Sequence, residues 1–172
     1  FNQIRQQTNV SDLVLDLRYN GGGFLYIASQ VGYMIAGDAR TSGRTFERLQ
    51  FNDKRVAETN DPNNNTPFFG TTSGFAGSGT TANTPLPQLN LSRVFVLAGP
   101  GTCSASESIV NALRGIDVQV VLIGDTTCGK PYGFTAKDNC GISYFPIEFQ
   151  GVNQLGFGDY ADGALSWFQI RP

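Results

Sequence analysis

The sequence predicts an α/β fold with a largely parallel sheet, because short apolar strands alternate with glycine turns and helices. An apolar run at residues 13–17 ends at the glycines of positions 21–23, and apolar residues then recur at helical spacing from Phe24 to Ile35. Residues 94–113 repeat this order of strand, glycine turn and helix. Ligand sites in such sheets gather at the carboxyl ends of the strands. We therefore expect the functional site at the edge where the two glycine turns lie.

The second unit consists of a strand at residues 94–98, a Gly-Pro-Gly turn at 99–101 and a helix from Ser104 to Leu113. A third strand is predicted at residues 118–123. A further strand is expected at residues 142–149, and Pro146 places it at a sheet edge because proline cannot donate a ladder hydrogen bond. The predicted sheet is therefore parallel at its centre, with extra edge strands.

Residues 60–87 are rich in Asn, Gly, Thr, Ser and Pro and are predicted to form a flexible surface loop. Such loops often serve as lids or substrate-contacting flaps, and a mobile insertion without a role is the alternative. No internal repeat or domain boundary appears, so we predict one domain over residues 1–172. The chain opens with Phe1 rather than Met, and we expect it to be a fragment of a longer protein.

Charge and hydropathy argue against two classes of partner. Twelve Lys and Arg residues against fourteen Asp and Glu give a net charge of -2, so no basic excess is present to hold a phosphate backbone. No apolar run approaches the roughly 20 residues that cross a bilayer. We expect neither nucleic-acid binding nor a membrane-spanning segment.

The chain has three cysteines and no histidine. Without histidine or a CxxC pair, neither a metal site nor a cofactor is expected, and Ser-His-Asp and Cys-His catalysis are excluded. Cys128 and Cys140 lie 12 positions apart around a polar loop. We predict that they form a local disulfide in an exported protein, with two free cysteines as the alternative.

Ser104 follows a tight turn and begins a helix. Unpaired N–H groups and the positive end of the helix dipole gather there, so a nucleophile and part of an oxyanion hole fit this turn. Simple N-capping by Ser104, with Glu107 completing a capping box, is the alternative.

Lys130 follows the next strand and should reach the same edge of the sheet. A lysine can act as a general base when burial lowers the pKa of its ammonium group. We expect Lys130 to be buried beside Tyr132 or Phe134, and an exposed lysine is the alternative. The glycines at 21–23 allow backbone N–H groups to approach a developing oxyanion, although a helix-initiating turn also explains them.

Three motifs together carry a family resemblance: Asp-Leu-Arg-Tyr-Asn-Gly-Gly-Gly at 16–23, Ser-Ala-Ser-Glu at 104–107 and Gly-Lys at 129–130. In this order they resemble the tail-specific, or C-terminal processing, serine peptidases. The resemblance implies a crotonase-like or ClpP-like β/α spiral, a periplasmic or secreted location, and a polypeptide substrate. The PDZ domain common in that family is not found in this chain, which would be the catalytic core alone.

By that resemblance, Ser104 is the nucleophile, Lys130 is its base, and the N–H groups of Gly22 and Ala105 form the oxyanion hole. Many members have Gln four residues after the lysine, where this chain has Phe134. Tyr132 or a backbone carbonyl is the candidate substitute. Asp117 corresponds only loosely to an acidic residue that some members carry after the serine.

The predicted function is hydrolysis of peptide bonds through an acyl-enzyme on Ser104. A competent pair requires Ser104 Oγ and Lys130 Nζ about 2.6–3.2 Å apart, or further apart without ligand. A non-catalytic peptide-binding or ligand-binding module on the same fold is the main alternative. Acyl-CoA chemistry on a crotonase-like scaffold ranks last, because it gives no reason for the serine-lysine pair.

Overall fold

A computed structural model describes residues 1–7, 10–73, 79 and 81–163 of the chain. Its centre is a three-stranded parallel sheet in the order β1-β4-β5. The strands are β1 (Val14–Asp16), β4 (Arg93–Ala98) and β5 (Gln119–Gly124). This sheet confirms the predicted α/β class and the parallel pairing of the three predicted strands.

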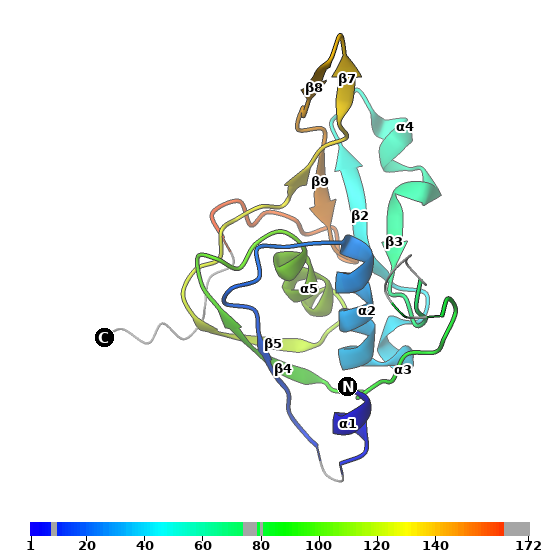
Figure 1. The fold of residues 1–172 in the computed structure, drawn as a ribbon, viewed down its shortest axis with the longest axis vertical. Coiled ribbons are helices and arrows are strands. Elements are labelled where there is room, and N and C mark those ends of the chain that lie inside the picture. Colours follow the sequence, from blue (N-terminus) through cyan, green and yellow to red (C-terminus); the bar gives the residue numbers. More distant parts are fainter. Residues whose placement is uncertain (8–9, 74–78, 80, 164–172) are drawn as a thin grey trace.

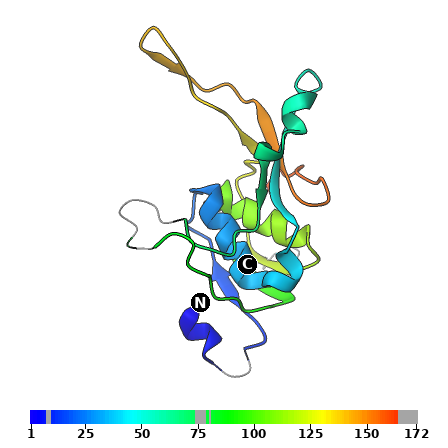
Figure 2. The same cartoon turned by 90° about the vertical axis from the view of Figure 1, so that its right-hand side faces the viewer.

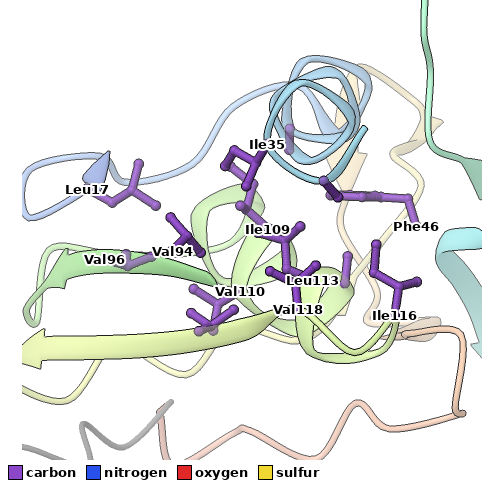
Figure 3. Packing of buried hydrophobic residues seen from close by; sticks show 14 of the residues in the cluster. Leu17, Ile35, Phe46, Val94, Val96, Ile109, Val110, Leu113, Ile116 and Val118 are labelled. Atoms are coloured by element: carbon purple, nitrogen blue, oxygen red, sulfur yellow. The ribbon is translucent and has the colours of Figure 1, made fainter. Parts of the chain in front are cut away.

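Helices α2 (Leu25–Ala36) and α5 (Ala105–Arg114) lie over this sheet (Figure 1). Helix α5 is buried along almost its whole length, because it contacts both α2 and the strands. Apolar side chains from β4, β5 and the two helices meet between these elements and exclude water, which is the main stabilising term of the fold (Figure 3). The larger side chains among them that are fully buried are Ile35, Val94, Val96, Val110, Leu113 and Leu122.

A second, antiparallel sheet has the order β3-β2-β9-β6 and was not predicted. Its strands are β2 (Thr45–Phe51), β3 (Asn65–Pro67), β6 (Tyr132–Gly133) and β9 (Phe149–Val152). Strand β2 also contacts α5, so the second sheet closes over the helix that begins after Ser104. Beyond this sheet, β7 (Lys137–Asn139) and β8 (Ile142–Tyr144) form a hairpin that projects from the body (Figures 1 and 2).

Two segments differ from their predictions. The single strand expected at residues 142–149 is divided into β8 and β9, with Pro146 in the irregular stretch between them, because proline has no N–H to donate. Within the predicted loop at 60–87, the chain forms the 3₁₀ helix η1 (Pro62–Asn64) and strand β3. Positions 74–78 and 80 of that loop lie outside the described residues.

The remaining helices are single turns: α1 (Asn2–Arg5), α3 (Asp38–Thr41) and α4 (Val56–Thr59). Among the described residues, no helix combines the length and the apolar character that a bilayer crossing requires.

Candidate active site

The segments that follow the three parallel strands meet at one edge of the sheet. The Thr102 hydroxyl donates a hydrogen bond to the carbonyl of Leu17 at 2.8 Å, and Cys103 N–H donates to the carbonyl of Asn20 at 3.1 Å. The backbone N–H of Cys128 in turn donates to the carbonyl of Thr102 at 3.0 Å. The turn after β4 is therefore hydrogen-bonded to both neighbouring segments, as parallel strand order predicts.

Ser104 occupies a strained position at the start of α5. Its backbone has φ 57° and ψ −117°, a region that a residue with a side chain rarely adopts. A strained strand-to-helix turn of this kind presents a serine hydroxyl outwards while the helix N–H groups point at the same space. The capping box expected as the alternative is present, with Glu107 accepting the N–H of Ser104, but a cap alone does not require this backbone strain.

Gly22 lies directly against Ser104. A Cβ atom on Gly22 would come within 2.9 Å of Ser104 Cβ and 3.3 Å of Ser104 Oγ, and φ of Gly22 is +123°. Only glycine satisfies both conditions. In this structure the N–H of Gly22 donates to Asn20 Oδ1 at 3.0 Å, whereas the N–H of Ala105 makes no hydrogen bond within the described part of the chain.

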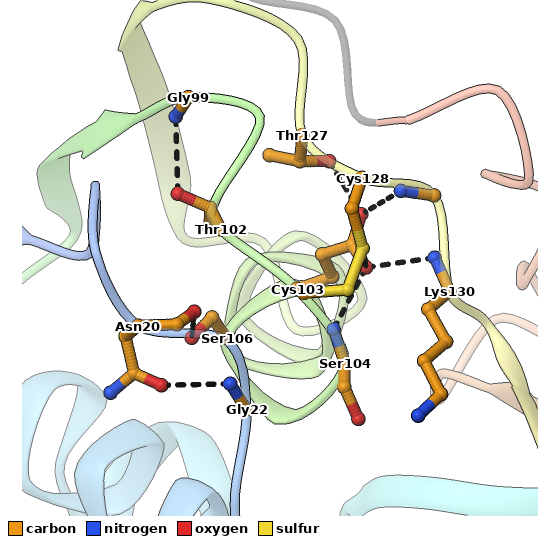
Figure 4. Close-up of a disulfide and its surroundings, with 12 residues drawn as sticks. Asn20, Gly22, Gly99, Thr102, Cys103, Ser104, Ser106, Thr127, Cys128 and Lys130 are labelled. Atoms are coloured by element: carbon orange, nitrogen blue, oxygen red, sulfur yellow. Dashed lines mark hydrogen bonds between the residues drawn. A yellow bond between two sulfur atoms is a disulfide. The ribbon is translucent and has the colours of Figure 1, made fainter.

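Ser104 and Lys130 line one cavity of about 250 Å³. Their side chains extend in the same direction from neighbouring segments (Figure 4). The expected burial of Lys130 is wrong, because its side chain is exposed, as are Tyr132 and Phe134. Among the described residues no hydrogen bond joins Ser104 Oγ to Lys130 Nζ. The structure therefore places the two groups at one cavity without pairing them directly.

Glu107 connects the serine turn to the lysine segment and is only 1% exposed. Its carboxylate accepts hydrogen bonds from the backbone N–H of Ser104 at 2.9 Å, of Gly129 at 2.8 Å and of Lys130 at 2.9 Å (Figure 4). The hydroxyl of Thr127 donates to it as well, at 2.5 Å. Sequence reasoning identified Glu107 only as part of a capping box. Its position three residues after Ser104 was the available signal, but the contacts with the lysine segment depend on the tertiary fold.

The disulfide joins Cys103 to Cys128, with Cα atoms 5.2 Å apart, and Cys140 is free and exposed. The predicted Cys128–Cys140 pair is therefore wrong. Cys103 and Cys128 follow adjacent strands β4 and β5, whereas Cys140 lies in the turn of the β7–β8 hairpin. The bridge links the residue before Ser104 to the segment that carries Lys130 (Figure 4).

One group of potential metal ligands gathers among the described residues, namely Cys103, Glu107 and Cys128. The two sulfur atoms are bonded to each other, so neither is a free thiolate, and the Glu107 oxygens accept the hydrogen bonds given above. In this oxidised form the group lacks the ligands of a metal site.

A second cavity of about 260 Å³ adjoins the first and has mostly apolar walls. Gly23 and Ala105 line both cavities, so the two spaces meet beside Ser104. Before the glycine turn, Arg18 donates to both carboxylate oxygens of Asp16 at 3.0 and 2.7 Å. These hydrogen bonds lower the pKa of Asp16 and orient the chain as it leaves β1.

The sequence profile of peptidase family S41 matches residues 1–137, and the chain belongs to this family. This confirms the resemblance to C-terminal processing peptidases. A search of curated proteins finds no match.

Three solved structures are similar to the chain. A Bacteroides fragilis protein assigned to the S41 proteases is 27% identical with a TM-score of 0.67, over 91% of this chain and 37% of that one. The photosystem II D1 C-terminal processing protease is 21% identical with a TM-score of 0.58, over 94% and 35%. A lipoprotein from Streptococcus agalactiae is 12% identical with a TM-score of 0.53, over 95% and 51%. The last two similarities concern the fold alone, and the chain spans about a third to a half of these proteins.

Proposed function

We propose that the chain carries the active site of a serine endopeptidase, with Ser104 as nucleophile and Lys130 as general base. The observation that carries this proposal is the strained Ser104 turn, which shares one cavity with Lys130 and touches Gly22. Membership of family S41 supports peptidase chemistry for this serine.

In this mechanism Ser104 Oγ attacks the peptide carbonyl carbon while its proton passes to Lys130 Nζ. The N–H groups of Ala105 and Gly22 stabilise the oxyanion, the latter after the Asn20 amide turns away. The C–N bond then breaks as Lys130 returns the proton to the departing amine. Water attacks the acyl-enzyme with Lys130 as its base, and Ser104 regains its proton. In this mechanism the nucleophile, the base and the oxyanion donors are all residues of this chain.

Together with this function we propose the finer features that the family resemblance implies. They comprise the crotonase-like or ClpP-like spiral core, a C-terminal processing type of cleavage on polypeptides, and a periplasmic or secreted location. The Cys103–Cys128 bridge supports an oxidising compartment, because disulfides persist there and are rare in the cytosol. The apolar second cavity offers room for a substrate side chain beside Ser104.

A peptide-binding module without turnover is the second candidate. Two observations favour it: Lys130 is exposed and, among the described residues, makes no hydrogen bond to Ser104, and Phe134 stands where many members have Gln. The strain at Ser104 argues for the enzyme, because a binding surface does not require it.

A fluorophosphonate probe separates the two candidates, since it reacts with an activated serine and leaves an ordinary surface hydroxyl intact. We expect covalent labelling of Ser104, located by peptide mass mapping, and no labelling of Ser104→Ala. Peptide binding without any labelling at Ser104 would favour the binding module.

A further inference from the structure

A buried carboxyl group lies in the wall of the cavity that Ser104 and Lys130 share. Glu47 belongs to β2, its side chain is 7% exposed, and it lines the same cavity of about 250 Å³. Among the described residues it forms no ion pair. Burying a carboxyl group is costly unless it is paired or hydrogen-bonded, and buried ionisable groups in a cleft are frequent at functional sites.

Glu47 is linked to the Ser104 side of the cavity. The hydroxyl of Ser108 donates a hydrogen bond to Glu47 Oε2 at 2.7 Å. Ser108 lies one helical turn after Ser104, and its N–H donates to the Ser104 carbonyl at 2.9 Å. The Glu47 carboxyl is therefore held by the helix that begins at the nucleophile.

Glu47 is also linked to the Lys130 side. A Cβ atom on Gly151 would lie 2.5 Å from Glu47 Cδ, so the absence of a side chain at this position makes room for the carboxyl group. The N–H of Gly151 donates to the carbonyl of Pro131 at 2.8 Å, and Pro131 directly follows Lys130. One hydrogen bond thus ties the Glu47 carboxyl to the helix after Ser104, and the space at Gly151 places it beside the strand that is hydrogen-bonded to the segment after Lys130.

We propose that Glu47 is a positioning residue of this site and that its carboxyl group orients the Lys130 amine towards Ser104. This inference rests on the proposed peptidase function. In the proposed arrangement the Lys130 amine turns within the shared cavity to donate one N–H to a carboxyl oxygen of Glu47, a contact that is not formed among the described residues. The nitrogen lone pair then stays free to accept the Ser104 proton. Glu47 thereby supplies what many members obtain from the Gln that Phe134 replaces here.

The protonation state of Glu47 decides how it acts. Burial raises the pKa of Glu47 above its usual value of 4.5, and the hydrogen bond from Ser108 opposes this rise. A carboxyl oxygen of Glu47 can accept the N–H in either protonation state, but the carboxylate also stabilises the ammonium form of Lys130 and so opposes proton transfer. Lys130 and Tyr160 are the other ionisable groups that line the same cavity, and burial together with the Glu47 charge raises the pKa of Tyr160.

The test compares Glu47→Gln with Glu47→Ala in peptide hydrolysis measured across pH. Glutamine stays neutral and keeps the acceptor oxygen, so we expect turnover within a few-fold of wild type, rising at a lower pH because no carboxylate forms. Glu47→Ala should lower kcat about 100-fold with little change in KM, as misplaced catalytic groups do. Glu148→Gln is the control, since the Glu148 side chain is nearly buried but pairs with Arg55 and Lys137 away from the cavity.

A stability measurement tests the ionisation of Glu47 without relying on activity. Because the folded-state pKa lies above the unfolded value, Glu47 destabilises the fold progressively as pH rises from about 4.5 through its raised pKa. The Tm of wild type should fall relative to Glu47→Gln over that interval. If the Tm values of wild type and Glu47→Gln change with pH in parallel, Glu47 does not titrate as proposed.

Two results overturn the inference alone: wild-type activity and pH profile in Glu47→Ala, or a Glu47→Gln variant as inactive as Glu47→Ala. A wild-type protein that neither cleaves peptides nor reacts with a fluorophosphonate at Ser104 overturns the proposed function itself. The two failures are therefore distinct.

Discussion

The carboxylate of Glu107 accepts a hydrogen bond from the backbone N–H of Lys130 at 2.9 Å. The same oxygen accepts the N–H of Ser104, also at 2.9 Å. One buried side chain thus fixes the main-chain positions of both proposed catalytic residues. Because these bonds involve the backbone, they set the spacing of the two chain segments and leave the Ser104 and Lys130 side chains free for chemistry.

Glu107→Ala should lower both stability and activity. It removes the acceptor of three part-buried backbone N–H groups and of the Thr127 hydroxyl, and since a lost hydrogen bond of this kind costs about 1–3 kcal/mol, the free energy of unfolding should fall by about 3 kcal/mol or more. Urea unfolding measures this loss, and peptide hydrolysis under native conditions measures the effect on the site. Glu58→Gln, at an exposed ion pair, is the control and should leave the urea midpoint unchanged.

The Cys103–Cys128 bridge should stabilise the fold and support turnover. Its two cysteines are 25 positions apart in the sequence, and for a loop of that length chain entropy predicts about 3.5 kcal/mol. We expect Cys128→Ser to unfold at lower urea concentration and to turn over more slowly, whereas Cys140→Ser matches wild type. Non-reducing peptide mapping reads the pairing directly, and a peptide that joins Cys128 to Cys140 would contradict the structure.

The parallel sheet could be predicted from sequence because its signals are local. Each strand is a short apolar run, and a glycine turn follows β4 directly and β1 a few residues later, so strand order also places Ser104 and Lys130 at one edge. The disulfide follows from the same topology, since Cys103 and Cys128 come after adjacent strands. Spacing along the sequence alone favoured the shorter Cys128–Cys140 separation and led to the wrong partner for Cys128.

The second sheet could not be predicted in this way. Strand β2 pairs with β9 about a hundred residues further along the chain, and such contacts leave little local pattern. The proposed role of Glu47 depends on these distant contacts, whereas Glu107 depends on tertiary contacts with the segment at 127–130. Lys130 is exposed, and the two aromatic residues expected to bury it, Tyr132 and Phe134, are exposed as well.

Ser104→Ala should abolish peptide hydrolysis while the protein still folds. The substitution removes the attacking oxygen and at most a helix cap, which costs about 1 kcal/mol. Ser106→Ala is the matched control, because the Ser106 hydroxyl donates to the Asn20 carbonyl and does not line the cavity that Ser104 and Lys130 share. It should keep substantial activity. Equal turnover by Ser104→Ala and wild type would exclude Ser104 as the nucleophile.

Lys130→Arg should be nearly inactive although it keeps the positive charge. A general base must be neutral to accept the Ser104 proton, and a guanidinium group does not lose its proton in proteins at working pH. We expect kcat/KM for a peptide substrate to be at least about 100-fold lower for Lys130→Arg than for wild type at every pH tested. Lys137→Arg, in the hairpin outside the cavity, should reproduce the wild-type profile. Wild-type turnover by purified Lys130→Arg would remove the general base from the mechanism, and the serine would then require a base other than this lysine.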